Sequence, residues 1–342
     1  MLKFIAQPHV SPAAPMGTAR RVIGTALALL MLAAAGSTSG CARAASSTLG
    51  PQELLERAWR EFRLEDFDLA QRDFDLALAK LNAQKPSTPA EEESNKKLRA
   101  NATYGLGLVA SLGHHGENPA RTTRLLQEVI GLSPHSDMAA WAALALAREQ
   151  YLPVTSDARE DVTKIKANYA QVMADYPGTP AADEAFVYMQ ALSIQSLAPG
   201  QIREAIKAIE GFLAAHPQPR YLASLCTLEA RGYRVLNEQG KALEMLIKAA
   251  KNKEIDPTNP QQDNAMDYYA IGLAAQYDVG DFATAREYYG KFLKDYPKDQ
   301  KAFTVQVHLQ RMAETEQRIA AELAGKVKSA GGPATTSAGG RP

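Results

Sequence analysis

The sequence predicts an all-α protein, an α-solenoid of about six stacked helical pairs closed by a C-terminal capping helix. Three observations predict this fold. The chain is rich in Ala, Leu, Glu, Lys, Arg and Gln, which favour helices, and no stretch alternates as a strand does. Prolines end successive amphipathic runs at a nearly constant spacing. A small residue followed by large apolar residues recurs at the same offsets in several of these runs.

The first expected element is an export signal over residues 1–40. Two arginines precede an apolar run, residues 22–35, and small residues lead from it to Cys41. Cations, a short apolar core and a small-residue cleavage site are typical of a secretory signal peptide. The run is shorter than the roughly 20 residues that span a bilayer. We expect translation to begin at Met16, which would give a compact signal.

Cys41 directly follows Gly40 in the cleavage region. This arrangement resembles the lipobox of bacterial lipoproteins, which implies that Cys41 becomes the acylated first residue of the mature protein. Residues 41–50 are then interpreted as a short flexible tether. Ala42 stands where inner-membrane lipoproteins carry Asp, so the resemblance implies an outer-membrane lipoprotein that faces the periplasm.

Three other interpretations of this segment remain. Cleavage after the A-x-A sequence Ala42-Arg43-Ala44 would release a soluble protein that begins at Ala45. The segment could instead stay in place as an uncleaved anchor. A twin-arginine export signal at Arg20-Arg21 is a third alternative, but the neighbouring residues fit that motif poorly.

Charge and cysteine content exclude several functions. The chain has 342 residues with 38 Lys and Arg against 38 Asp and Glu; residues 1–40 hold three of the cations and no anion. The rest is slightly acidic, so we expect no nucleic-acid partner and no polybasic membrane patch. The second cysteine, Cys226, lies in an apolar helical stretch and is expected to be buried and inert.

The repeat is marked by prolines spaced 43, 40, 40 and 40 residues apart. They are Pro134, Pro177, Pro217, Pro257 and Pro297. A less regular first member ends near Pro86. A fixed period of roughly 20–50 residues indicates a repeat architecture, and proline ends each helix because it has no N–H group.

The second helical segment of the period carries a small residue and then large residues four and seven positions later, which share one face. The matches are Phe67, Ala70, Phe74 and Ala77; Ile202, Ala205, Ile209, Phe212 and Pro217; and Phe282, Ala285, Tyr289, Phe292 and Pro297. The small residue lets two helices approach closely. These positions resemble those of the tetratricopeptide repeat (TPR), although the period is longer than the typical ~34 residues.

We expect the solenoid to occupy residues 51–325. The expected pairs are 51–63 with 67–82, 90–112 with 118–132, 136–151 with 158–174, 180–197 with 201–215, 219–237 with 240–252, and 261–278 with 281–295. Their starts are marked by a capping box at Thr88–Glu91 and by Thr179-Pro180 and Asn259-Pro260. A charged helix over 299–324 would cap the array, and residues 326–342 would be disordered.

The resemblance narrows at Tyr176-Pro177-Gly178-Thr179-Pro180, which is similar to the joint between repeats of outer-membrane TPR lipoproteins of the BamD-like class. The best-known member of that class is a subunit of the β-barrel assembly complex. A periplasmic TPR protein that works with the Tol-Pal system has a similar joint. Tyr296-Pro297 repeats the joint in part, and His216-Pro217 departs from it, so the resemblance implies a class and not a member.

No catalytic, metal-binding or cofactor-binding residue is expected. The histidines form no H-E-x-x-H motif, and the chain has no C-x-x-C, phosphate loop or G-x-S-x-G elbow. The carboxylates near Glu61 and Asp73 are expected to form a solvated face; docking of a basic partner is the alternative. The Tyr268-Tyr269 and Tyr288-Tyr289 pairs should each turn one ring inward, and both tryptophans should be core.

We therefore expect a non-enzymatic, membrane-tethered TPR scaffold of the cell envelope that binds partner proteins or extended peptides and no small-molecule substrate. One task that fits is outer-membrane protein assembly. The alternative is an accessory lipoprotein of pilus, secretin or cell-wall (Tol-Pal associated) machinery. Cleavage after Ala44 would make it a soluble periplasmic TPR scaffold.

Overall fold

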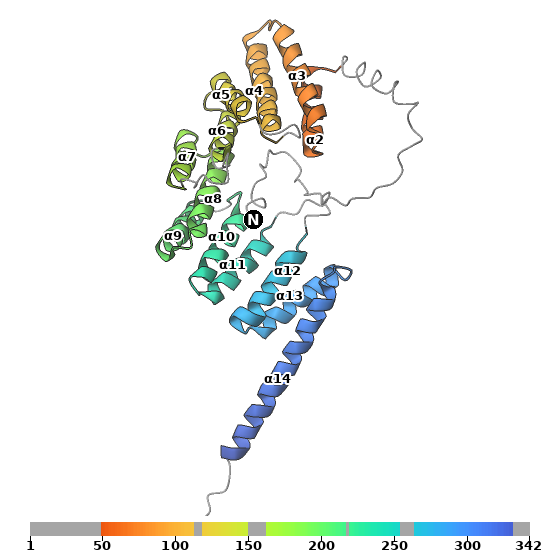
Figure 1. Ribbon diagram of the computed structural model, residues 1–342, viewed down its shortest axis with the longest axis vertical. Helices are drawn as coiled ribbons and strands as arrows, with labels where there is room; N and C mark the ends of the chain where they lie inside the picture. Colours follow the sequence, from red (N-terminus) through yellow and green to blue (C-terminus); the bar gives the residue numbers. More distant parts are fainter. Residues whose placement is uncertain (1–48, 113–117, 150–161, 217–218, 254–262, 331–342) are drawn as a thin grey trace, which may run out of the picture. The chain divides into compact units, whose positions relative to one another are not determined.

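The computed structural model describes residues 49–112, 118–149, 162–216, 219–253 and 263–330. In these ranges the chain forms 13 α-helices and a π-helical turn, with no strand (Figure 1). The signal segment with Cys41, the suggested start at Met16, Pro217, and residues 331–342 of the tail lie outside the described residues.

The helices form six TPR-like antiparallel pairs and a final helix, which confirms the expected all-α fold. The pairs are α2 (Pro51–Arg63) with α3 (Phe67–Ala83), α4 (Pro89–Leu112) with α5 (Pro119–Leu132), α6 (Asp137–Glu149) with α7 (Val162–Asp175), α8 (Pro180–Gln195) with α9 (Pro199–Ala215), α10 (Leu222–Val235) with α11 (Gln239–Lys251), and α12 (Ala265–Leu273) with α13 (Phe282–Asp295). The π-helix η2 (Ala274–Val279) continues α12, and α14 (Ala302–Ala330) ends the array.

The chain divides into two compact units, residues 1–221 and 222–342. Within the first, the first helices of the pairs also contact one another in succession, α2 to α4, α4 to α6 and α6 to α8. Within the second, α11 contacts both α12 and η2, and α13 contacts α14. That the pairs form one continuous array over 51–325 stays a prediction.

Side-chain caps begin α4 and α8 where the sequence predicts them, whereas the third predicted start, Asn259-Pro260, lies outside the described residues. The Thr88 hydroxyl accepts a hydrogen bond from the Glu91 amide (3.2 Å), and the Glu91 carboxylate reaches back to the Ser87 amide (2.7 Å). Thr179 caps α8 through the amide of Ala182, ahead of a proline in the first turn. These bonds satisfy amides that have no partner inside the helix.

Four of the turns inside the pairs contain a residue in the left-handed region. It is Glu65 between α2 and α3 (φ 62°), Leu197 between α8 and α9 (57°), Asn237 between α10 and α11 (61°) and Gly280 before α13 (79°). A left-handed residue reverses the chain in very few residues, so the two helices of a pair can lie side by side.

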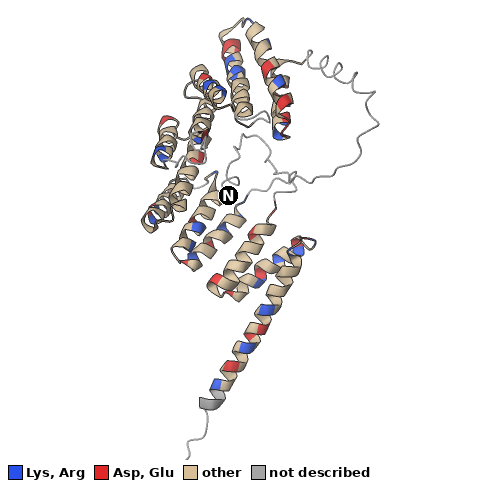
Figure 2. Cartoon of the chain, viewed as in Figure 1, with Lys and Arg blue, Asp and Glu red and all other residues tan. Residues whose placement is uncertain are grey.

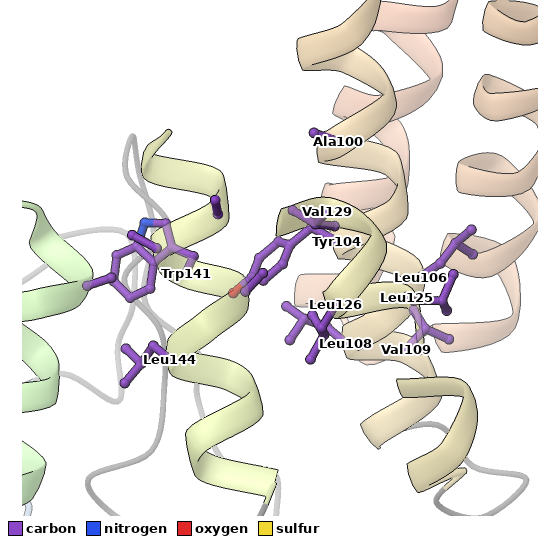
Figure 3. Packing of buried hydrophobic residues seen from close by; sticks show 14 of the residues in the cluster. Ala100, Tyr104, Leu106, Leu108, Val109, Leu125, Leu126, Val129, Trp141 and Leu144 are labelled. Carbon is purple, nitrogen blue, oxygen red and sulfur yellow. The ribbon is translucent and has the colours of Figure 1, made fainter. Parts of the chain in front are cut away.

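The core of the first unit is aromatic where α2, α3 and α4 meet. Trp59 stacks edge-on against Phe62 and Phe74, and its indole donates to the Asn101 amide oxygen (2.7 Å). Further along, Tyr104 of α4 is buried and points toward the helix that carries Trp141 and Leu144 (Figure 3). The prediction that both tryptophans belong to the core is confirmed.

The core of the second unit gathers around α13. Tyr289 and Phe292 are fully buried against Ala275 of η2 and against Val305 and Met312 of α14. Tyr288 is buried as well, so the expectation that one ring of the Tyr288-Tyr289 pair points outward is wrong. The reason is that Tyr288 packs edge-on against Tyr268 of α12, while the Lys291 ammonium lies 4.3 Å from its ring centre.

Two boundaries differ from the sequence-based expectation. Leu49 packs against the first core, and its carbonyl accepts a bond from the Lys80 ammonium (2.6 Å), so the expected tether over 41–50 ends before Leu49. At the other end α14 runs to Ala330, past the expected stop at 324. A single glycine, Gly325, is tolerated inside the helix, two lysines and an alanine continue it, and the paired glycines at 331–332 come afterwards.

The acidic first pair is not a wholly solvated face. Asp73 is fully buried and paired with Arg57, which reaches it from the preceding helix. Glu61 lies beside this pair, and burial together with the negative charge of Asp73 raises the pKa of Glu61 to about 6. A buried carboxylate needs a close cation, and Arg57 supplies it.

Candidate interaction surface

One apolar face of α12 is left open to solvent. Met266, Ala270, Leu273 and Tyr277 follow one another at intervals of four, three and four residues and therefore share a face of the helix. Met266 is 55% exposed and Tyr277 57%, and the two residues between them are half-buried. We call these four residues the α12 stripe.

The opposite face of α12 makes the core. Ile271, Gly272, Ala274 and Ala275 are buried, with Gly272 directly against the ring of Tyr289. The helix is therefore apolar on both sides, and only one side is covered. Asp267 is the one charged residue of α12 and Asp278 that of η2, and Figure 2 shows α12 mostly in the colour of uncharged residues. An open apolar stripe on an otherwise packed helix marks a surface for association.

The π-helical turn η2 sets the side chains at the end of this stripe. Its wider turn places Gln276 inside, where its amide oxygen accepts a bond from the Tyr289 hydroxyl (3.0 Å). Tyr277 follows on the outside, and Val279 is 41% exposed beside it. Single π-helical turns occur often at functional sites. Here the helical backbone hydrogen bonds continue through the turn, while the aromatic ring of Tyr277 is presented to solvent.

Tyr277 is held in place by His308 of α14. The Tyr277 hydroxyl and His308 Nδ1 lie 2.9 Å apart, and the two rings meet edge to face. The His308 ring stacks on Tyr289, with centroids 5.5 Å apart and planes 8° apart. Burial, and secondarily the nearby Arg311 charge, lowers the pKa of His308. When the Tyr277 hydroxyl donates to Nδ1, this nitrogen must be unprotonated, which a neutral imidazole allows.

The neighbouring first helix, α10, supplies positive charge. Thr227, Arg231 and Arg234 are exposed and lie on one face at intervals of four and three residues. Arg234 approaches Asp278 of η2 at 3.8 Å, which brings the ends of α10 and η2 together. No carboxylate among the described residues pairs with Arg231. The α10 cations therefore meet the end of the α12 stripe at Arg234, and Arg231 lies one turn earlier on the same face of α10.

The last helix adds one large apolar side chain. Ala302, Val305, His308 and Met312 are the α14 residues described as buried, whereas Phe303 has 74% of its surface exposed. Farther along, Ile319 and Leu323 are also exposed, at 47% and 57%. The first turn of α14 thus carries an exposed aromatic ring of its own.

In the first unit, polar side chains of the first helices α6 and α8 have partners on neighbouring elements. Glu184 of α8 is buried and accepts hydrogen bonds from the hydroxyls of Tyr188 (2.8 Å) and Tyr221 (3.0 Å). Tyr169 stacks on Tyr188, and the Arg148 guanidinium lies over the same ring. Burial, followed by the negative charge of Glu184, raises the pKa of both hydroxyls that bind it. This cluster joins side chains of α6, α7 and α8 with Tyr221.

The predicted repeat residues lie mainly in the cores. Those that are buried are Ala70, Phe74, Ala77, Ile202, Ala205, Ile209, Ala285, Tyr289 and Phe292. Phe67, Phe212 and Phe282 are partly buried, and Pro297 is exposed in the loop after α13. The structure thus places the repeat residues in the packing between helices. Cys226 is buried and free, which confirms the expected burial, and this burial raises the pKa of its thiol to about 11.

Sequence reasoning missed the glycines that receive the large repeat residues. A Cβ atom on Gly105 would lie 2.3 Å from the Phe74 ring, and one on Gly272 would lie 2.3 Å from the Tyr289 ring. Gly107 stands in the same relation to Leu126 at 2.9 Å. The signal was available in part, since a glycine inside a helical pattern usually has a packing reason.

Two further features are limited to the part of the chain that is described. No group of three His, Cys, Asp or Glu side chains is placed to hold a metal ion there. None of the helices in the described ranges combines the length and apolarity required to cross a bilayer.

No protein-family model and no curated protein matches the sequence. Among solved structures the chain is similar to PilW, described as a widely conserved type IV pilus biogenesis factor, with 17% identity and a TM-score of 0.46 over 75% of this chain and 98% of that one. It is also similar to an assembly chaperone of RpL4, Acl4 residues 1–338, with 12% identity and a TM-score of 0.36 over 80% of this chain and 100% of that one. These similarities say nothing about function.

Proposed function

We propose that the protein is a TPR-like scaffold that binds another polypeptide across the open first-helix face of its second unit. The observation that carries this proposal is the α12 stripe, an exposed apolar row that no other described helix covers. Tyr277 and Arg234 lie together at its end, and Tyr and Arg are the side chains that most often anchor protein interfaces.

The location of this scaffold is part of the same proposal. Lipid attached at Cys41 would hold it to the outer membrane facing the periplasm, where the partners would be envelope proteins. Its task there would be outer-membrane protein assembly, with service to pilus, secretin or cell-wall machinery as the alternative. Co-purification from solubilised envelopes would assign the task, because the two sets of partners differ.

A photo-crosslinking amino acid placed at Met266, Tyr277 or Phe303 in living cells tests the binding surface. We expect each position to capture a partner that mass spectrometry identifies. Glu244 of α11 and Lys294 of α13 are exposed on second helices and serve as matched controls. Crosslinks of equal yield at the control positions, or none at the three test positions, would refute the proposal.

A further inference from the structure

The chemistry of the partner can be inferred from the border of the α12 stripe. We infer that the partner segment is amphipathic and acidic, with a row of aliphatic side chains that packs on the α12 stripe and carboxylates that meet Arg231 and Arg234 of α10. The inference rests on the proposed function, since it names the partner class for the same surface.

The aliphatic part follows from the shape of the stripe. Met266 and Tyr277 are eleven residues apart, which corresponds to about 16 Å along a helix. That length fits three turns of a partner helix, or a short extended segment. Packing apolar side chains on this row removes apolar surface from water, which favours binding in proportion to the area covered. A polar partner would gain no such stabilisation from covering the row.

The acidic part follows from the charges that surround the row. On the α10 side both exposed charges are cations, and Asp278 forms the single carboxylate contact with Arg234. Asp267, at the other end, is already paired with the Lys253 ammonium at 2.6 Å. Arg231 is therefore the side chain with donors to spare, and its planar guanidinium suits a carboxylate. A basic partner would meet like charge at this edge.

The anchor is Tyr277, because its ring is exposed while its hydroxyl is fixed by His308 (2.9 Å). A ring that is already oriented loses little conformational freedom when a partner covers it. The π-helical turn and the His308 contact thus prepare the end of the stripe before binding. Val279 of η2 and Val235 of α10 are also open to solvent, at 41% and 40%.

Two synthetic peptides of about 18 residues, five helical turns, test the inference on the full-length chain. Both carry leucines at intervals of four, three and four residues; the flanking positions are Glu in one and Lys in the other. We expect the Glu peptide to bind at least tenfold more tightly by fluorescence anisotropy. Tyr277→Ala and Arg231→Glu should each weaken its binding about tenfold, and Lys294→Glu on α13 should change it less than twofold.

Met266→Ser guards against an effect of Tyr277→Ala on folding, because Met266 is far from the His308 contact and should also weaken the Glu peptide. Equal affinity for the two peptides, no binding of either, or an equal loss in Lys294→Glu would overturn the inference. Crosslinks at Tyr277 in cells together with equal affinity for the two peptides would leave the proposed function standing and remove only the acidic partner.

Discussion

Gly272 is the point where α12 and α13 approach most closely. A Cβ atom there would lie 2.3 Å from Cε1 of Tyr289, whose ring is fully buried and stacked on His308. Neither ring can move without disturbing the other. The repeat pattern of a small residue followed by a large one therefore also requires a glycine on the facing helix, against which the large side chain packs.

We expect Gly272→Ala to lower the free energy of unfolding by about 1–3 kcal/mol, the usual cost of overpacking. Urea denaturation followed by circular dichroism measures this. Gly290→Ala on α13 is the matched control, because nothing lies within 4 Å of its added Cβ and alanine favours the helix by about 1 kcal/mol. A Gly272→Ala variant as stable as the wild type would show that Tyr289 is not tightly held.

His308 makes the second unit sensitive to pH. It is the single histidine of residues 222–342, and Tyr269, Tyr277, Tyr289 and Arg311 are the titratable groups that face it. Burial lowers its pKa in the folded state below the unfolded value of roughly 6.5. The unfolded chain then binds more protons in this range, so stability is present above about pH 6.5 and is lost as the pH falls below it.

Proton NMR of the imidazole should give a pKa for His308 below 6.5, and thermal unfolding should occur at a lower temperature at pH 5.5 than at pH 7.5. In His308→Gln, the contribution of the second unit to this difference in unfolding temperature between pH 5.5 and pH 7.5 should disappear. A normal His308 pKa, or a pH dependence that survives the substitution, would contradict the assignment.

At the scale of the element, the pairs depend on how their turns reverse the chain. Leu197 in the α8–α9 turn and Asn237 in the α10–α11 turn both adopt the left-handed conformation that reverses the chain, with φ of 57° and 61°. Asn adopts this left-handed conformation readily, whereas a bulky residue such as Leu adopts it at a cost. Leu197 is also 60% exposed, so its side chain contributes little to packing.

We expect Leu197→Asn to raise the free energy of unfolding of the first unit by about 0.5–1 kcal/mol. The reverse change, Asn237→Leu, should lower that of the second unit by a similar amount. Tryptophan fluorescence during denaturation reports the first unit alone, because Trp59 and Trp141 both belong to it. Destabilisation by Leu197→Asn would mean that leucine makes a contact worth more than the backbone strain.

Helix positions were predictable because their signals are local. Prolines, caps and the small-to-large spacing lie within a few residues of the boundaries that they set, as at Thr179 before α8. Relations between helices were not predictable in this way. Asp73 looked solvated because the cation that neutralises it, Arg57, comes from the preceding helix. The α12 stripe could not be found from the sequence because an apolar helix does not reveal which of its faces is covered.

At the scale of the whole molecule, the proposed scaffold needs a point of attachment. The helical array offers surfaces for polypeptides, but none of its described helices could cross a bilayer. The proposed attachment is a lipid on Cys41, which follows a short apolar run and three small residues. Acyl chains hold a protein at a membrane because each buried CH₂ contributes about 0.8 kcal/mol.

Cys41→Ser should abolish the incorporation of labelled fatty acid and leave the protein in the periplasmic fraction or as an uncleaved precursor. The wild type should fractionate with outer membranes, and mass spectrometry should find an acylated N-terminus at Cys41. A fusion that begins at Met16 should be processed identically. Cys226→Ser is the matched control, since that thiol is buried and should not change fractionation. A mature protein that begins at Ala45 without fatty acid would establish cleavage after Ala44 and a soluble scaffold instead.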